Sequence, residues 1–126
     1  MTLADLILFE SVGGHTLGRH VDKSEEWLRE RLGTKGLKEA SSFTSIDEAT
    51  ECVSAALELR RNEVEKWLAD GSHRRLELEV DWPCPVGRVV VRDHGVVTHG
   101  SRVRVVLARY EYGAPPFYVL TAYPRR

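Results

Sequence analysis

Cysteine is scarce in this chain of 126 residues, which limits how the fold can be stabilised. Two cysteines, Cys52 and Cys84, are too few for the disulfide framework on which many small secreted domains depend. They also leave a structural zinc site without its usual cysteine pairs. We therefore expect a fold that is stabilised by packing alone, without disulfides or a structural metal.

Long apolar runs are absent too. No stretch approaches the roughly 20 consecutive apolar residues that a transmembrane helix needs, so no membrane insertion is expected. The apolar segment 3–9 is short and has no basic flank, so it does not read as a signal peptide.

A strong charge of one sign is the third missing feature. The 18 basic residues are balanced by 19 acidic ones, which gives a net charge of −1. A permanent, non-specific nucleic-acid binder is usually strongly basic, so that class is disfavoured. An enzyme with a local basic cleft remains open. The length suits one domain over residues 1–126, and 42% hydrophobic with 29% charged residues is ordinary for a globular protein.

The hydrophobic period changes near residue 70, from helical spacing to alternation. Residues 4–10 are predicted to form a short helix that ends at Gly13-Gly14. Ser45 and Glu48 have capping-box spacing, and the apolar stripe after them predicts one long helix that ends at Gly71. Helices followed by strands predict an α+β fold, with N-terminal helices packed on a C-terminal antiparallel sheet.

The segment from residue 15 to residue 32 also has helical spacing. One narrow sector contains four apolar residues: Leu17, Val21, Leu28 and Leu32. A neighbouring stripe contains His20, Ser24, Trp27 and Arg31. The stripe requires a continuous helix axis, but Ser24 followed by two glutamates is also a good N-cap that would divide the helix in two. Residues 33–36 are predicted to form a loop.

Strand patterns follow residue 75. Residues 76–82 alternate between apolar and acidic side chains, and further strands are predicted over 88–92, 102–110 and 117–123. Turns are predicted at Gly87 and over 93–95, 99–100 and 113–116. The connections are too short for crossovers, so the pairing should be antiparallel. In the last strand, a period of two places four side chains on one face: Phe117, Val119, Thr121 and Tyr123.

Five histidines are candidates for chemistry, and three of them (His73, His94 and His99) lie in polar, turn-like contexts where we assign no role. His15 and His20 are five residues apart, whereas metal-binding pairs on a helix are usually four apart. No carboxylate cluster or cysteine pair accompanies them, so no metal site is expected. A serine-nucleophile elbow and a P-loop are both missing.

Several segments, taken in their order along the chain, resemble a known family. They are Gly14-His15-Thr16-Leu17 running on to His20-Val21, then Arg31, then Ala40-Ser41-Ser42-Phe43-Thr44, and finally Leu120-Thr121-Ala122-Tyr123-Pro124. Together they resemble the bacterial RNase A-like toxin domain, which occurs at the C-terminus of contact-dependent growth inhibition proteins and other polymorphic toxins. The resemblance runs from residue 13 to residue 124.

The resemblance implies a metal-independent ribonuclease with N-terminal helices against a curved antiparallel sheet, RNase A-like but without the disulfides of the vertebrate enzymes. Residue by residue, it implies a catalytic set of His20, Arg31, Thr121 and Tyr123. His15 also matches a family position, with a structural or substrate-orienting role. The vertebrate enzymes use two histidines as base and acid, and here His15 is the only second histidine in the motif region. The identity of the general acid is therefore open.

The implied residues suit RNA cleavage in which the substrate's 2′-hydroxyl is the nucleophile. The imidazole of His20 would remove its proton, because its pKa of about 6.5 is close to working pH. The planar guanidinium of Arg31 matches two phosphate oxygens. Thr121 would hydrogen-bond the phosphate, and Tyr123 would be a further donor or the proton source for the leaving 5′-oxygen.

Substrate contacts outside this set are interpreted from side-chain type. Arg102 and Arg104 alternate with valines and would hold backbone phosphates, although solvated edge charges are the slightly preferred interpretation. Trp27 would either stack on a base or belong to the core.

The toxin resemblance also implies a cognate immunity protein, an RNA substrate such as tRNA, and delivery of the chain as an effector that acts in the target-cell cytoplasm. An alternative is a catalytically inactive RNA- or protein-binding module of the same fold. A third possibility is a different enzyme with the same order of helices and strands, for which the sequence has no motif.

Overall fold

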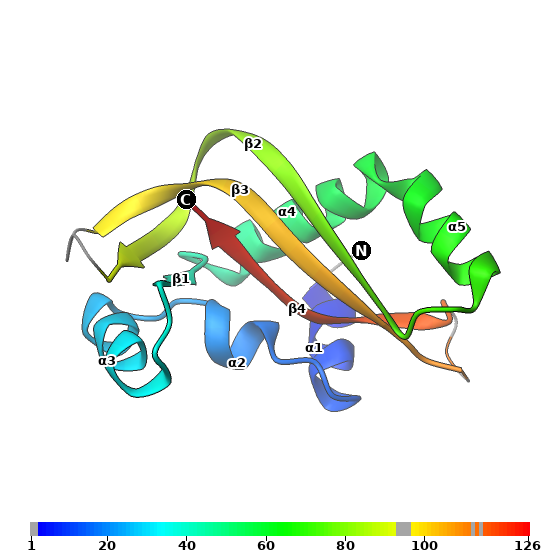
Figure 1. Ribbon diagram of the computed structural model, residues 1–126, viewed down its shortest axis with the longest axis horizontal. Helices are drawn as coiled ribbons and strands as arrows, with labels where there is room; N and C mark the ends of the chain where they lie inside the picture. The colour runs from blue at the N-terminus through cyan, green and yellow to red at the C-terminus, as the bar shows by residue number, and fades with distance from the viewer. Residues whose placement is uncertain (1–2, 93–96, 112, 114) are drawn as a thin grey trace.

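The computed structural model describes residues 3–92, 97–111, 113 and 115–126. Figure 1 shows the elements, which are α1 (Leu3–Ser11), α2 (Thr16–His20), α3 (Glu25–Lys35), β1 (Glu39–Ser42), α4 (Ile46–Leu59), α5 (Arg61–Asp70), β2 (Arg75–Val91), β3 (Val97–Arg109) and β4 (Phe117–Arg125). The predicted α+β class is confirmed, with one short strand placed among the helices. Among the described helices, none is long and apolar enough to cross a membrane.

The strands form one antiparallel sheet in the order β1-β2-β3-β4. The segments predicted as separate strands over 76–82 and 88–92 are one long strand, β2. Gly87 lies inside this strand with φ 61°, next to a register shift, and is not a turn. A side chain there would collide with the Ser42 carbonyl and the Pro124 ring, so the strand can bend only at a glycine.

Two other predicted turns have different outcomes. Residues 99–100 belong to β3, so the turn predicted there is wrong. Residues 93–95 lie outside the described part of the chain. Around Gly113, the backbone turns from β3 to β4 as predicted, with the Gly113 N–H donating to the Tyr110 carbonyl.

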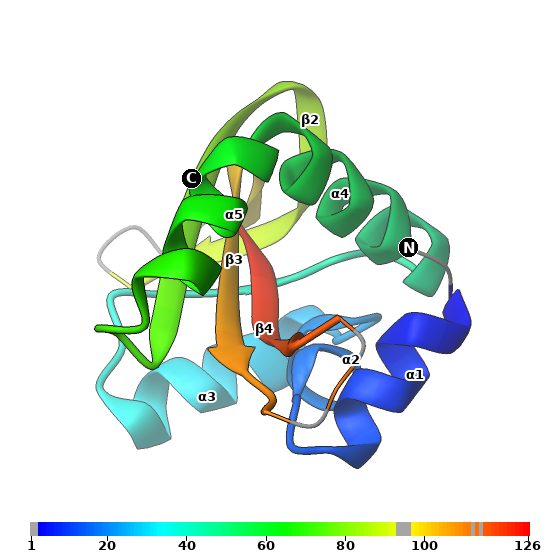
Figure 2. The same cartoon turned by 90° about the vertical axis from the view of Figure 1, so that its right-hand side faces the viewer.

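The main core lies between the sheet and the helices α4 and α5, and α1 closes one end of it. Alternation in β2 is as predicted, since Leu78 and Val80 are buried while Glu77 and Glu79 face out. Figures 1 and 2 show α4 and α5 on one side of the strands and α2 and α3 on the other.

The predicted long helix is two helices, because the chain breaks at Arg60. This residue leaves helical geometry (φ −109°, ψ 24°), and its guanidinium donates to the Glu79 carbonyl on β2. The capping box at the start of α4 is present, with Ser45 Oγ accepting from the Glu48 N–H. Glu48 reaches back to the N–H of Thr44, one residue earlier than the motif implies.

The segment 15–32 is also two helices, so the continuous His20 to Arg31 stripe is wrong and the alternative N-cap is confirmed. After α2, Val21 is extended and Asp22 has φ 53°. Ser24 then caps α3 by accepting from the Trp27 N–H. The helix α3 continues to Lys35 and ends at left-handed Gly36, so most of the predicted loop 33–36 is helical.

Because of this break, the four apolar residues predicted to share one sector belong to two different cores. Leu28 and Leu32 form a second cluster with Ala40 of β1 and Val90 of β2. Leu17 and Val21 pack against the main core instead. The helix α3 is thus attached to the β1 end of the sheet, whereas α2 packs mainly on β4.

Candidate active site

A cleft of about 470 Å³ opens where α2, the α3–β1 connection and the exposed face of β3 and β4 meet. Its lining contains His15, Arg19, His20, Arg31, Leu37, Lys38, Glu39, Ala40, Ser41, Arg104, Thr121, Tyr123 and Arg125. All four residues of the implied catalytic set are among them, together with His15 and Arg104. Trp27 and Arg102 are not.

His20 ends α2 and is clamped to β1 by backbone and side chain. Its carbonyl accepts the Phe43 N–H at 2.7 Å, and its ring Nδ1 lies 3.1 Å from the Ser41 carbonyl oxygen. A carbonyl can only accept, so Nδ1 carries the proton and Nε2 keeps its lone pair. The imidazole is thus held in the tautomer that a proton acceptor needs.

Burial keeps this imidazole neutral. His20 is only 9% exposed, and loss of hydration lowers its pKa from 6.5 to about 4. The hydrogen bond to Ser41 raises the pKa, whereas the charge of Arg31 lowers it further. His20 is therefore deprotonated at neutral pH.

Thr121 and Tyr123 reach the cleft because β4 contains a bulge. Val106 pairs with Thr121 but Leu107 pairs with Val119, so Leu120 has no partner in the β3 register. Thr121 and Tyr123 face the cleft while Val119 faces the main core, and the prediction that all share one face is wrong for this reason.

The two side chains differ in how they are held. The Tyr123 ring lies against His20, with ring centroids 5.0 Å apart. Thr121 is buried, and among the described residues its Oγ1 has no hydrogen-bond partner. A buried hydroxyl without a partner is costly, so a polar ligand group in the cleft would satisfy it.

Arg31 enters the cleft from α3 and lies over the face of Trp27, with its guanidinium carbon 5.6 Å from the ring centroid. Lys23 contacts the same ring at 5.1 Å. Trp27 is half-buried against the second core cluster. It therefore orients Arg31 and does not line the cleft as a base-stacking residue.

Acidic partners distinguish the arginines of the sheet. Arg104 pairs with Glu77 yet still lines the cleft. Arg102 pairs with Glu79 at 3.8 Å and donates to the Arg126 carbonyl, and it is not part of the cleft lining. Of the two arginines on β3 that were predicted to hold phosphates, only Arg104 lines the cleft.

His15 is fixed to β4 beside Thr121, because its backbone N–H donates to the Leu120 carbonyl at 2.8 Å. Gly14 makes this approach possible, since a Cβ there would lie 2.6 Å from the Val119 carbonyl oxygen. Burial, followed by the charge of Arg19, lowers the pKa of His15. Its Nδ1 is buried without a hydrogen-bond partner among the described residues.

Comparison with known proteins adds to this geometry. A family model described as the bacterial CdiA-CT RNAse A domain matches residues 14–124. The chain belongs to this family. Among solved structures, it is similar to the CdiA-CT/CdiI complex from Y. kristensenii 33638, with 29% identity and a TM-score of 0.84 over 90% of this chain and 100% of that chain. A comparison with curated proteins gives no match.

The cleft of this CdiA-CT RNase A-like toxin domain also contains residues that the sequence analysis did not select. Among the described residues, Arg19, Lys38 and Arg125 bring the cationic side chains of its lining to five, against one acid, Glu39. Arg125 contacts Glu39 at 3.7 Å and Glu79 at 3.2 Å. Of these three cationic residues, only Arg19 could have been predicted from the sequence, because it is next to His20. Lys38 and Glu39 depend on β1, a strand too short to be recognised from alternation.

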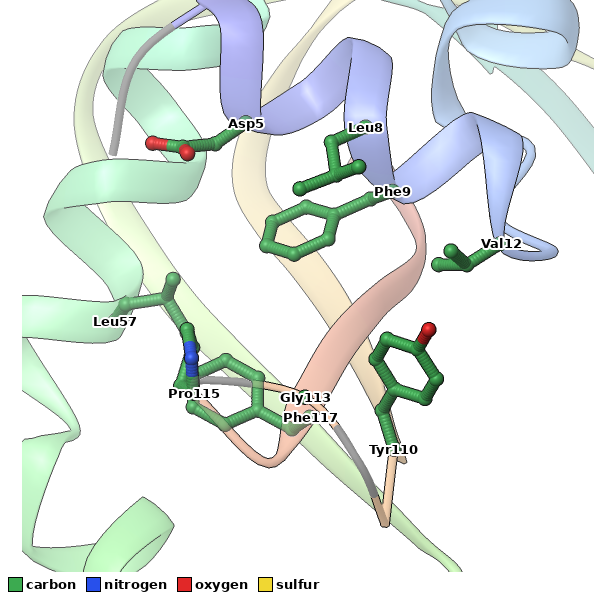
Figure 3. A pocket seen from close by; sticks show the side chains of 9 residues that line it. All are labelled: Asp5, Leu8, Phe9, Val12, Leu57, Tyr110, Gly113, Pro115 and Phe117. Atoms are coloured by element: carbon green, nitrogen blue, oxygen red, sulfur yellow. The ribbon is translucent and has the colours of Figure 1, made fainter.

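A second cavity of the toxin domain, of about 290 Å³, lies between α1, α4 and the β3–β4 connection (Figure 3). Its lining is mostly apolar, with Phe9, Leu57 and Phe117 on three sides. Asp5 is the one charged group among the described residues that line it. This cavity has neither the histidines nor the arginines of the cationic cleft.

Within residues 3–92, 97–111, 113 and 115–126, no group of three or more His, Cys, Asp or Glu side chains is arranged to hold a metal ion.

Proposed function

We propose that this toxin domain cleaves RNA without a metal, by attack of the substrate's 2′-hydroxyl on the adjacent phosphorus. The observation that carries the proposal is the hydrogen bond from His20 Nδ1 to the Ser41 carbonyl, which leaves Nε2 as a proton acceptor in a cationic cleft. The membership of an RNase A-like family supports the same reaction class.

His20 is the general base. Its Nε2 takes the proton of the 2′-hydroxyl as the oxygen bonds to phosphorus. Its lowered pKa keeps the base form populated at neutral pH, and the negative phosphate of a bound substrate would raise that pKa toward the useful range. The phosphodiester then loses its 5′-oxygen, which gives a 2′,3′-cyclic phosphate and a free 5′-hydroxyl end.

Arg31 and Thr121 bind the scissile phosphate. Within the described structure Arg31 has no carboxylate partner, so its charge is available to the two non-bridging oxygens. Thr121 Oγ1 donates a hydrogen bond to one of them and thereby gains the partner it lacks in the free protein. Arg104 and His15 are further contacts for the substrate backbone at the edge of the cleft.

Tyr123 acts at the leaving group. Its ring lies against His20, with ring centroids 5.0 Å apart, and its side chain lines the same cleft. We propose that it hydrogen-bonds the departing 5′-oxygen and supplies, directly or through water, the proton that this oxygen takes up.

The test is cleavage of total RNA by the purified domain in excess EDTA. Wild type is expected to cleave, and His20→Ala is expected to lose about 10²- to 10⁴-fold in rate. His99→Ala, which removes an exposed histidine outside the cleft, is the matched control and should cleave normally. Cleavage that disappears with EDTA, or that persists in His20→Ala, would contradict the proposal. A folded wild type that binds RNA without cutting it would favour the inactive binding module.

We also propose that a cognate immunity protein protects the producing cell and that the domain acts in the cytoplasm of a target cell, where RNA such as tRNA is accessible. The relative from Y. kristensenii was crystallised as a CdiA-CT/CdiI complex. Five cationic side chains in the cleft would be neutralised by acidic residues of such a partner. The affinity for such a partner, measured by isothermal titration calorimetry without RNA, should therefore fall when Arg31 and Arg104 are both replaced by glutamate.

A further inference from the structure

A second polar hollow, of about 790 Å³, lies at the far end of β2 and β3 from the β1 edge of the sheet. Its lining includes His73, Arg74 and Arg75 from the α5–β2 connection, and Arg109, Glu111 and Tyr118 from the other strands and their connection. None of these residues belongs to the cleft described above. The hollow nevertheless shares its sheet face with that cleft, as the strand register shows.

Alternate residues of β3 run from the cleft to the hollow along one face of the sheet, as the strand pairing shows. Arg104 pairs with Tyr123, Val106 with Thr121, and Ala108 with Tyr118. Alternate residues of one strand share a face, and directly paired residues of antiparallel strands share it too. Because the bulge at Leu120 shifts the alternation of β4 by one residue, Tyr118 lies on the same face of the sheet as Thr121. Two residues along β3 are about 7 Å, so the hollow begins about one nucleotide's length beyond Thr121.

The hollow has an excess of positive charge, because two of its arginines form no salt bridge among the described residues. Arg74 and Arg75 are exposed, and neither has an acidic partner among the described residues. Arg75 lies opposite Ala108 in the sheet, directly beside Tyr118 in the next strand pair. Glu111 is the one acid among the described residues of the lining. Two free guanidinium groups at this position suit a phosphate of a bound strand.

Arg109 has a separate, structural task. Its guanidinium donates to the carbonyls of Trp67, Leu68 and His73, and it stacks on the Trp67 ring at 4.8 Å. It therefore fixes the end of α5 and the start of β2. This attachment holds the backbone that carries Arg74 and Arg75 against the sheet.

An aromatic ring accompanies these charges. Tyr118 is half-buried and meets Tyr110 edge to face, with ring centroids 6.2 Å apart. Gly13 lies against its hydroxyl, since a Cβ at Gly13 would be 3.3 Å from Tyr118 Oη. A phenol ring held in this way beside an arginine is the combination that binds a base and its phosphate in single-stranded nucleic acid.

We propose that the hollow at Arg74, Arg75 and Tyr118 is a second nucleotide subsite, which takes the phosphate and base of a neighbouring nucleotide of the same RNA strand. The proposal rests on RNA being the substrate of the cleft. It makes the sheet face one continuous track, with chemistry at Thr121 and strand binding at Tyr118. A substrate long enough to reach both positions should bind better than a dinucleotide that fills the cleft alone.

The experiment compares Arg75→Ala and the double variant Arg74→Ala/Arg75→Ala with Arg61→Ala. Arg61 is an exposed arginine of α5 outside both sites, so it controls for the loss of one surface charge. Binding is measured by fluorescence anisotropy with a single-stranded octanucleotide that is 2′-O-methylated and cannot be cleaved, over a series of KCl concentrations. Cleavage is measured separately on a dinucleotide and on an unmodified octanucleotide.

Arg75→Ala is expected to weaken octanucleotide binding about tenfold at low salt, and each arginine removed should reduce the slope of log K against log salt by about 0.7. KM for octanucleotide cleavage should rise, while dinucleotide cleavage stays at the wild-type rate. Tyr118→Leu should cause a further loss of affinity with little change in the salt slope, because stacking does not release counterions.

Arg75→Ala and Arg61→Ala binding the octanucleotide equally would overturn the subsite, even if cleavage in the cleft depends on His20 as proposed. Failure of wild type to cleave the dinucleotide and the octanucleotide would instead count against the ribonuclease proposal. The anisotropy measurement needs no cleavage, so it decides the subsite in either case. Thermal unfolding of each variant, compared with wild type, identifies any loss that comes from misfolding.

Discussion

Replacing His20 by glutamine should make the free energy of unfolding less dependent on pH below neutrality. In the folded protein, burial lowers the pKa of His20 to about 4, and in the unfolded chain it returns to 6.5. Between these values the unfolded chain takes up a proton that the folded protein does not. Wild type must therefore lose stability as pH falls from about 6.5, and the loss levels off below about 4.

The size of the effect follows from the two pKa values. They differ by about 2.5, and each unit is worth about 1.4 kcal/mol, so the limiting loss is about 3.4 kcal/mol. At pH 5 the loss relative to pH 7 is about 2 kcal/mol. Glutamine does not titrate, and its side-chain amide can still donate to the Ser41 carbonyl in place of Nδ1.

Urea denaturation of both proteins at pH 7 and pH 5 measures this difference. Other histidines and carboxylates titrate in both proteins, so the change in stability of wild type minus that of His20→Gln isolates His20. The expected value is about 2 kcal/mol, with wild type the more sensitive to acid. Equal losses in the two proteins would show that His20 is hydrated in the folded state and would remove the physical basis for its low pKa.

Four further predictions follow from the same geometry. The value of kcat/KM should stay constant from pH 7 to about pH 5 and fall tenfold per unit below about 4, as a pH–rate profile would show, because His20 acts in its neutral form. Thr121→Val should lower kcat/KM about tenfold without lowering the denaturation midpoint, since the buried Oγ1 has no hydrogen-bond partner among the described residues. A lower midpoint would mean that the hydroxyl is structural. Arg31→Lys should reduce kcat/KM at least about tenfold by loss of the planar fork, whereas the same change at Arg29, two residues earlier on the exposed side of α3, should not. Gly87→Ala should destabilise the fold by about 2 kcal/mol or more in urea, because φ is 61° and the Ser42 carbonyl is in the way.

Local signals in the sequence predicted the elements whose ends they define. Ser45, Gly71 and the alternation after residue 75 each act over a few residues, and each is found where predicted. The break at Arg60 has no such signal, because it contains neither proline nor glycine. It depends on the contact of Arg60 with Glu79, which is distant in the sequence. Tertiary contacts of this kind cannot be read from periodicity.

The site shows the same division. Resemblance of short segments selected His20, Arg31, Thr121 and Tyr123, and these side chains meet in one cleft. The predicted stripe from His20 to Arg31 on one helix was wrong, since these residues belong to different helices. Strict alternation along β4 was likewise a wrong prediction, because a bulge halfway along the strand changes the face on which the following side chains lie. Residues from β1, such as Glu39, depend on a four-residue strand whose pairing with β2 is entirely long-range.

The cleft takes its parts from the two ends of the chain. His20 comes from the first helices, and its orienting carbonyl from Ser41, whereas Thr121 and Tyr123 stand within the last six residues of the sequence. A chain that stops before β4 thus carries the base without the hydroxyls and the phenol. Under the proposed mechanism, the domain becomes toxic only when its last strand has been made and paired, so incomplete chains would be harmless to the cell that synthesises them.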